Sequence, residues 1–235
     1  DEPYYANSDY FLPALASQNR FVFSQLIESE SLQLHDKIFI DLAYMHHLFN
    51  EWRGANEQSH SADTKLQDIW EYGISNGLRS AVTFWKSEKK DFAEKYISLL
   101  KSIESEFTTN DYINLSSFNE HIQDPFLNNW GAYMYIRLVI HGEKVSDTLN
   151  DLVRNNYQDN SNDHSPRNKD GRNIQLLRPF LEICLSERSS ELIDALETFS
   201  SFEWLVLLNT LSKPRYIPIF INNKDLSIKV AVILK

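Results

Sequence analysis

The sequence has little of what breaks or cross-links a polypeptide chain. Only 6 glycines and 7 prolines occur in 235 residues, which disfavours a β-sandwich, since that fold needs a turn roughly every ten residues. Cys184 is the single cysteine, so an internal disulfide and a thiolate-rich zinc site are both excluded. Because Cys184 lies in the apolar run 179–185, we expect a small buried hydrophobic side chain rather than a catalytic thiol. No stretch approaches the ~18 uninterrupted apolar residues of a transmembrane helix, so we expect no membrane partner.

Sequence motifs for catalysis and phosphate binding are also missing. The chain has no Gly-x-Ser-x-Gly nucleophile motif, no Gly-x-x-x-x-Gly-Lys loop and no glycine-rich turn between a strand and a helix. Neighbouring carboxylates such as Glu104 and Glu106 lie in polar surroundings, with no sign of the cleft that acid–base catalysis needs. These absences count against an enzyme, and we predict no catalytic residue and no cofactor.

Basic residues are fewer than acidic residues. The chain has 33 acidic and 23 basic residues, which gives a net charge of −10. Such a surface repels nucleic-acid phosphate and anionic lipid, so we expect no nucleic-acid partner. It attracts a basic partner, although many cytosolic proteins are acidic simply for solubility. We expect a cytoplasmic protein; because the sequence begins at Asp1 rather than Met, removal of a secretory signal leaves the periplasm open.

Hydrophobic residues are plentiful, at 42% of the sequence with 13% aromatic, and they recur at the three-to-four spacing of amphipathic helices. This pattern predicts an all-α protein with a substantial core. The predicted helices cover residues 9–28, 32–52, 63–85, 91–104, 130–140, 145–154, 174–185, 190–199 and 202–211. Gly73 and Gly77, four apart in one of these helices, would let another backbone approach closely, which predicts packing rather than a ligand site.

Two segments depart from the helical pattern. Residues 155–173 are rich in Asn, Asp, Ser, Pro and Gly, which predicts a mobile surface loop. This loop would separate a helical half at 1–154 from a second half at 174–235, with both halves packed as one globular unit. Near the end, β-branched residues at 216–221 and 226–234 flank a turn sequence. We predict a small C-terminal β-hairpin there, with a short final helix as the alternative.

One layout occurs three times: an apolar helix ends in a short charged turn, and an acidic residue opens the next helix. Acidic residues at these positions suit the positive end of the helix dipole. Since the turns are too short for a crossing connection, each predicts an antiparallel helical hairpin. Stacked hairpins give an irregular bundle or a short α-solenoid. The three turns are Ser87–Lys89, Gly142–Lys144 and Ser186–Arg188, followed by Asp91, Asp147 and Glu191.

Two further patterns indicate weak candidate sites. His47 and Glu51 lie one helical turn apart, as two metal ligands on one helix do. No third ligand is recognisable, so we interpret the pair as an ordinary surface contact and predict no metal. Tyr133 and Tyr135 flank Met134, and all three cannot face one core. One of the two rings is therefore a candidate exposed contact for a partner.

The repeated layout covers residues 77–85, 130–153 and 176–199, with the turns Ile140-His141-Gly142-Glu143-Lys144 and Leu185-Ser186-Glu187-Arg188. In this respect about half of the chain resembles the all-helical immunity proteins of bacterial polymorphic-toxin and contact-dependent competition systems. The resemblance implies a protein that neutralises a cognate toxin by occluding its active site, with no catalytic residues of its own.

Toxins that attack nucleic acids are commonly basic around their active sites, so an acidic helical surface would be drawn to such a site. The alternatives are a helical-repeat scaffold for a cellular partner and a metal-dependent hydrolase that uses the helix of His46 and His47. A homo-oligomer stays open. Under the immunity hypothesis the candidate contact residues are Glu143, Asp147, Asp159, Asp163, Asp170, Glu187, Glu191, Tyr133 and Tyr135.

Overall fold

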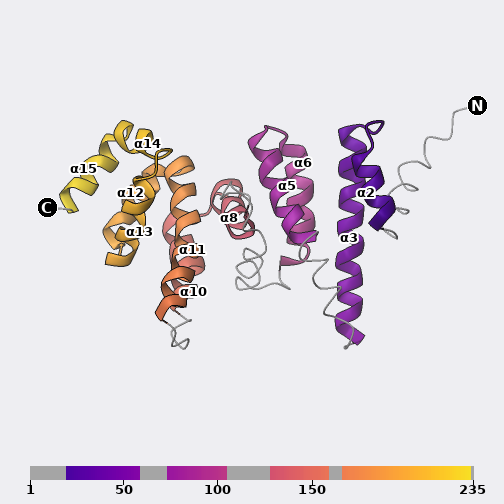
Figure 1. Ribbon diagram of the computed structural model, residues 1–235, viewed down its shortest axis with the longest axis horizontal. Helices are drawn as coiled ribbons and strands as arrows, with labels where there is room; N and C mark the ends of the chain where they lie inside the picture. Colours follow the sequence, from indigo (N-terminus) through magenta and orange to yellow (C-terminus); the bar gives the residue numbers. More distant parts are fainter. Residues whose placement is uncertain (1–19, 59–72, 105–127, 159–165, 234–235) are drawn as a thin grey trace, which may run out of the picture. The chain divides into compact units, whose positions relative to one another are not determined.

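The computed structural model describes residues 20–58, 73–104, 128–158 and 166–233, and all regular elements within them are helices (Figure 1). The prediction of an all-α protein is confirmed. The chain divides into two compact units, Asp1–Thr108 and Thr109–Lys235.

This division differs from the one expected at residues 155–173, because that stretch lies within the second unit. Its two ends belong to helices α10 (Asn155–Gln158) and α11 (Pro166–Glu187). Pro166 takes the first helical position, where its missing amide hydrogen costs nothing. A proline that reads as a loop signal in the sequence is here a helix start.

Within the described residues of unit 1 the helices are α2 (Arg20–Glu28), α3 (Leu34–Gln58), α5 (Ser75–Lys86) and α6 (Lys90–Lys101). α2 packs on α3, where the rings of Phe23 and Tyr44 stack with centroids 4.1 Å apart. α5 and α6 lie side by side as an antiparallel hairpin (Figure 1). In the short turn between them, Glu88 has a φ of 60°, in the left-handed region. The first predicted hairpin is confirmed.

The glycines near the start of α5 make room for side chains from α3 and α6. A Cβ on Gly77 would lie 2.6 Å from Cε of Met45 and 3.1 Å from Cδ2 of Leu100. A Cβ on Gly73 would lie 2.8 Å from Cε1 of Phe49. Met45 and Phe49 are one turn apart on α3, so their spacing matches that of the two glycines. Packing at the glycines is confirmed, but the close approach of another backbone is not, because side chains of α3 and α6 fill the space.

Unit 2 is a succession of mostly short helices around α11. The indole nitrogen of Trp130 donates a hydrogen bond of 3.0 Å to the Leu176 carbonyl and ties α8 to α11. In chain order the elements besides α10 and α11 are α8 (Asn129–Tyr135), the π-helical η5 (Ile136–Ile140), α9 (Val145–Thr148), the π-helical η6 (Leu149–Arg154), α12 (Ser189–Ala195), the 3-10 helix η8 (Leu196–Thr198), α13 (Ser201–Leu211), α14 (Ile217–Asn222) and α15 (Lys224–Ile233).

The other two predicted hairpins belong to unit 2. η5 turns back into α9 through Gly142, whose φ of 68° is again in the left-handed region, and α11 turns into α12 at Arg188. The paired helices pack against each other in both cases, so these predictions are confirmed. In the part of the chain described here, no helix is both long and apolar enough to cross a membrane.

The expectation of an exposed ring at Tyr133 or Tyr135 is wrong. Tyr133 is 8% exposed, Tyr135 3% and Met134 0%. Every residue of α8 is buried, and the helix packs on α11. A helix inside a unit has no solvent face, so three consecutive residues can all be covered. The two tyrosines are core residues and cannot serve as surface contacts.

The predicted C-terminal β-hairpin is also wrong, because the chain forms α14 and α15 there. Pro218 lies in the first turn of α14, where proline is tolerated. The residues read as a hairpin turn are a link between two helices. In that link the side chain of Asn223 accepts a hydrogen bond of 3.1 Å from the Leu226 amide and caps α15.

Candidate functional site

Asp41 of α3 is the centre of a buried polar cluster in unit 1. Its carboxylate accepts a hydrogen bond from the Tyr96 hydroxyl of α6 and two from the Asn76 amide of α5, at 3.0 and 3.1 Å. Burial raises the pKa of Asp41, and the hydrogen bonds from Tyr96 and Asn76 oppose this shift in part. The cluster joins three helices, so we assign it a structural role.

Glu203 is a comparable buried carboxylate in unit 2, at 1% exposure. It forms a capping box with Ser200, whose amide donates to the carboxylate at 2.7 Å. Arg154 donates to it at 2.7 and 2.9 Å, and the Tyr157 hydroxyl at 2.6 Å. Burial acts to raise the pKa of Glu203, but the hydrogen bonds from Arg154, Tyr157 and Ser200 outweigh it and hold the pKa below its ordinary value. This network fastens η6 and α10 to the start of α13.

Two of the helical turns of unit 2 lie side by side. Arg188, between α11 and α12, donates a hydrogen bond to the Leu138 carbonyl of η5. Glu191 of α12 accepts a hydrogen bond of 3.4 Å from the Val145 amide, which opens α9. The same carboxylate accepts a hydrogen bond of 2.8 Å from Nε of Arg188. Arg188 and Glu191 therefore hold the η5–α9 turn against the α11–α12 turn.

We define the tip surface as residues 141–148 and 186–194. It brings together Glu143, Asp147, Glu187 and Glu191, the predicted contact residues from the acid-led helix starts, although the two pairs lie far apart in the sequence. Asp147 and Glu187 are exposed, so their charges face solvent.

One further exposed carboxylate, that of Asp194 in α12, belongs to the tip surface and was missed by sequence reasoning. It lies one turn after Glu191, the residue that defined the acid-led start of α12. Extending the pattern by one turn would have found Asp194, because residues three apart lie near each other on a helix surface.

Two other acidic side chains of the tip surface are only partly exposed, because each pairs with an arginine. Arg137 approaches the Glu143 carboxylate at 2.5 Å, and Arg188 pairs with Glu191. These arginines partly neutralise the two carboxylates, which therefore contribute less than exposed acids to the field outside the molecule. Glu143 and Glu191 serve mainly to hold the turns in place.

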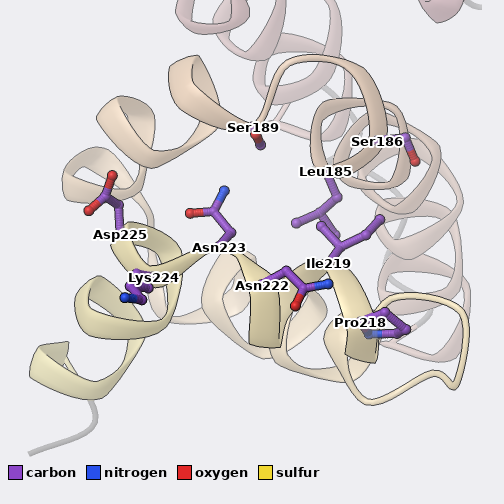
Figure 2. Close-up of a pocket in the computed structure, with 9 residues that line it drawn as sticks. All are labelled: Leu185, Ser186, Ser189, Pro218, Ile219, Asn222, Asn223, Lys224 and Asp225. Carbon is purple, nitrogen blue, oxygen red and sulfur yellow. The ribbon is translucent and has the colours of Figure 1, made fainter.

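A cleft of about 750 Å³ adjoins the tip surface on the side of α14 and α15. Figure 2 shows Leu185 and Ile219 close together on one side of the cleft, whereas Asn223 points across the opening toward Ser189. The cleft therefore offers hydroxyl and amide groups beside a small apolar surface. The lining residues are Leu185, Ser186, Ser189, Pro218, Ile219, Asn222, Asn223, Lys224 and Asp225.

A buried carboxylate with several cations lies on α11, one turn before the cleft. Glu182 is 1% exposed, and its carboxylate contacts Arg178 at 3.1 Å, Lys213 at 2.7 Å and Arg215 at 3.5 Å. We call these four residues the basic cluster. Lys213 and Arg215 follow α13 and Arg178 lies on α11, so no spacing in the sequence links them and the cluster was not predicted.

The structure does not describe the side chains of three predicted contact residues. Asp159 and Asp163 fall between α10 and α11 in residues that are not described, and Asp170 belongs to α11 but its side chain is not described. Their part in binding stays a prediction.

The metal candidates are only partly described. His46 shares a hydrogen bond of 3.0 Å with Asn50, His47 is half-buried, and the side chain of Glu51 lies outside the description. Among the described side chains, no group of three or more His, Cys, Asp or Glu residues could hold a metal ion. Cys184 is fully buried, as predicted, and burial raises the pKa of its thiol, which disfavours the reactive thiolate.

Comparison with known proteins finds no match to the chain among family models, curated proteins or solved structures. Any functional conclusion therefore rests on the residues and geometry of the chain itself.

Proposed function

We propose that this protein is an immunity protein, which binds a cognate bacterial toxin and covers the toxin's active site without transforming it. The observation that supports the proposal is the tip surface, where two turns from distant parts of the sequence pack together and the carboxylates of Asp147, Glu187 and Asp194 are exposed.

The interior of the molecule supports binding rather than catalysis. The carboxylates of Asp41, Glu182 and Glu203 are each enclosed by hydrogen-bond or ion-pair partners from other elements. Each of them therefore serves to join helices. The carboxylates that remain at the surface can act only on what approaches from outside.

Charge gives a physical mechanism for recognition. A toxin that is basic around its active site is attracted to an acidic surface from beyond contact distance, which speeds the encounter. At contact, the two interlocked turns present a surface whose backbone is already fixed, so little ordering entropy is lost on binding. We place the protein in the cytoplasm, where such a toxin would act.

The test is co-expression with the product of the neighbouring gene in bacteria. The proposal predicts that the neighbour alone stops growth, that this protein restores it, and that the two co-purify. A harmless neighbour, or one that kills in spite of this protein, would refute the proposal.

A matched pair of double variants tests the tip surface itself. Asp147→Asn with Glu187→Gln removes two exposed charges there, and we expect it to weaken the complex about tenfold or more at low salt. Asp91→Asn with Glu94→Gln makes the same change on exposed residues of α6 in unit 1, and we expect little effect. Equal losses in both variants would mean that the net charge matters and the tip surface does not.

A further inference from the structure

The last two helices leave much of their apolar surface open to solvent. α14 has the sequence Ile-Pro-Ile-Phe-Ile-Asn, yet none of its six residues is buried. Its Ile217 and Ile221 are 42% and 66% exposed. In α15, which packs on α14, Ile228 and Val232 are 61% and 63% exposed. Single exposed apolar side chains are ordinary, but a group of them on neighbouring elements marks an interaction surface.

The outer face of α15 has an order that indicates the kind of partner. Ile228 and Val232 lie one turn apart and form a row along the helix. At 3.6 residues per turn, Lys224 lies about 60° to one side of this row and Asp225 about 40° to the other. All four side chains are exposed. An apolar row flanked by charges of opposite sign is the pattern of a seam between two parallel helices.

The two flanking charges are available to a partner. Among the described residues, neither Lys224 nor Asp225 forms an ion pair. Lys229, the other basic residue of α15 in that part of the chain, is already paired with Glu197. The outer face of α15 therefore has no net charge, and it offers one unpaired charge of each sign.

This balance of charge favours a second copy of the chain over other partners. Two copies with a net charge of −10 repel each other, so they can meet only where the local charge is balanced. About a twofold axis parallel to α15, the Lys224 side of one helix faces the Asp225 side of the other, and the contact occurs twice. An anionic membrane or a partner of one charge sign would leave Asp225 or Lys224 facing a like charge.

We propose that two copies of this chain form a dimer through the outer faces of α15. Ile228 and Val232 of each copy lie in the seam, and Lys224 of each copy pairs with Asp225 of the other. One short helix buries less than the ~800 Å² per partner of a standard interface, so the exposed isoleucines of α14 must extend the contact. The dimer does not depend on the protein being an immunity protein.

Sedimentation velocity of the full chain tests whether the dimer exists. The proposal predicts a dimer whose share rises with protein concentration between about 1 and 100 μM, as expected for a small interface. A chain that stays monomeric over this range would overturn the proposal. A larger assembly would also overturn it, because a twofold contact closes at two copies.

A matched pair of variants locates the contact. Ile228→Lys places a charge in the seam and should weaken the dimer about tenfold or more. Leu205→Lys makes a comparable change on α13, at a side chain that is 65% exposed, and should leave the dimer unchanged. A dimer that tolerates Ile228→Lys, or is equally weakened by Leu205→Lys, would contradict a seam on α15.

Reciprocal charge changes test the pairing of Lys224 with Asp225. Lys224→Glu alone and Asp225→Lys alone should each weaken the dimer about fivefold or more at low salt, because like charges then meet at both contacts. An equimolar mixture of the two variants should form a heterodimer with nearly wild-type affinity, since each contact then joins an acidic and a basic side chain. This recovery would also show that both variants fold. A mixture as weak as the single variants would overturn the pairing.

Discussion

Asp41 and Glu203 are both buried carboxylates, yet their surroundings move their pKa values in opposite directions. Asp41 meets a neutral hydroxyl and a neutral amide, which offset its lost hydration only in part, so its pKa rises. Glu203 meets the Arg154 guanidinium together with Tyr157 and a backbone amide, which outweigh burial, so its pKa falls. The two residues must therefore affect stability differently as pH changes.

Asp41→Asn should remove the part of the pH dependence of folding stability that comes from the Asp41 carboxyl. Because the folded pKa of Asp41 is raised above its unfolded value of about 3.9, its contribution to stability is full below about pH 3.9 and is lost as pH rises through the folded pKa. Asparagine stays neutral, so the variant should gain stability relative to wild type as pH rises above about 4. Urea unfolding from pH 4 to 8 measures this difference, and parallel curves for the two proteins would contradict the account.

Glu203→Gln should instead lose stability relative to wild type, and the loss should be largest at neutral pH. The folded pKa of Glu203 lies below its unfolded value of about 4.3, so its contribution is full above about pH 4.3 and is lost as pH falls through the folded pKa. At neutral pH we expect the variant to lose about 3 kcal/mol, because Arg154 loses its charged partner. Urea unfolding extended from neutral pH down to about pH 2 should show the loss shrinking below about pH 4.3. A loss that stays constant with pH would mean that packing dominates.

Two turn residues with positive φ provide a matched test of backbone strain. A Cβ on Gly142 meets nothing within 4 Å and its φ is 68°, so Gly142→Ala should cost about 1 kcal/mol from conformation alone. Glu88 occupies the corresponding region with a φ of 60°, and Glu88→Gly should stabilise by roughly 0.5–1 kcal/mol. Thermal unfolding measures both, and shifts of the same sign would contradict the assigned conformations.

At the scale of elements, the C-terminal helices show why local composition misleads. Leu226, Ile228, Val230 and Val232 read as strand residues because three of them are β-branched. In a strand all four would share one face, since they are two apart. In α15 they separate: Leu226 and Val230 are buried, whereas Ile228 and Val232 are 61% and 63% exposed. Packing against α12 and α14 decides the structure, and the sequence of the segment alone does not contain that information.

The cap of α15 is open to a direct test. Asn223→Ala removes the side-chain acceptor for the Leu226 amide and should destabilise the protein by about 1 kcal/mol. Because Asn223 caps the N-terminal end of α15, far-UV circular dichroism should show a small loss of helical signal as the first turn of α15 frays. An unchanged melting temperature, or a gain of β signal, would contradict the helical assignment.

The packing of α5 on α3 follows from the sequence more directly. Two glycines one turn apart are rare enough in a helix to predict a close neighbour, and Met45 and Phe49 are that neighbour. Gly77→Ala should destabilise by about 1–3 kcal/mol, because the new methyl group meets Met45 and Leu100 together. Urea unfolding measures this, with Gly142→Ala as the reference for a glycine in open space. A loss smaller than that of the reference would mean that the Met45 side chain moves aside freely.

At the scale of the whole molecule, the acidic character is unevenly divided. Unit 1 has 17 acidic and 10 basic residues and a net charge of −7, while unit 2 has 16 and 13 and a net charge of −3. The predicted contact residues all lie in unit 2. Any advantage of the tip surface therefore comes from the arrangement of its charges rather than from their number.

The candidate site could be predicted only where one helix or one turn defines it. The hairpin turns and their acid-led helix starts follow from spacing, and so does the placement of Asp147 and Glu187 at helix ends. The neighbours of these residues do not follow, because Arg137 reaches Glu143 and Arg188 reaches Leu138 only once the helices have packed. The same reason hid the basic cluster, whose members meet from two separate segments of the chain.

The claim that the protein acts by binding is tested most directly by titrating the cognate toxin's activity with purified protein. Occlusion predicts a linear fall that ends at one equivalent, and a toxin that regains full activity and unchanged mass after the complex is dissociated. Complete loss of activity at a small fraction of an equivalent, or a toxin recovered cleaved or modified, would contradict the account, because only a catalyst acts on many molecules in turn.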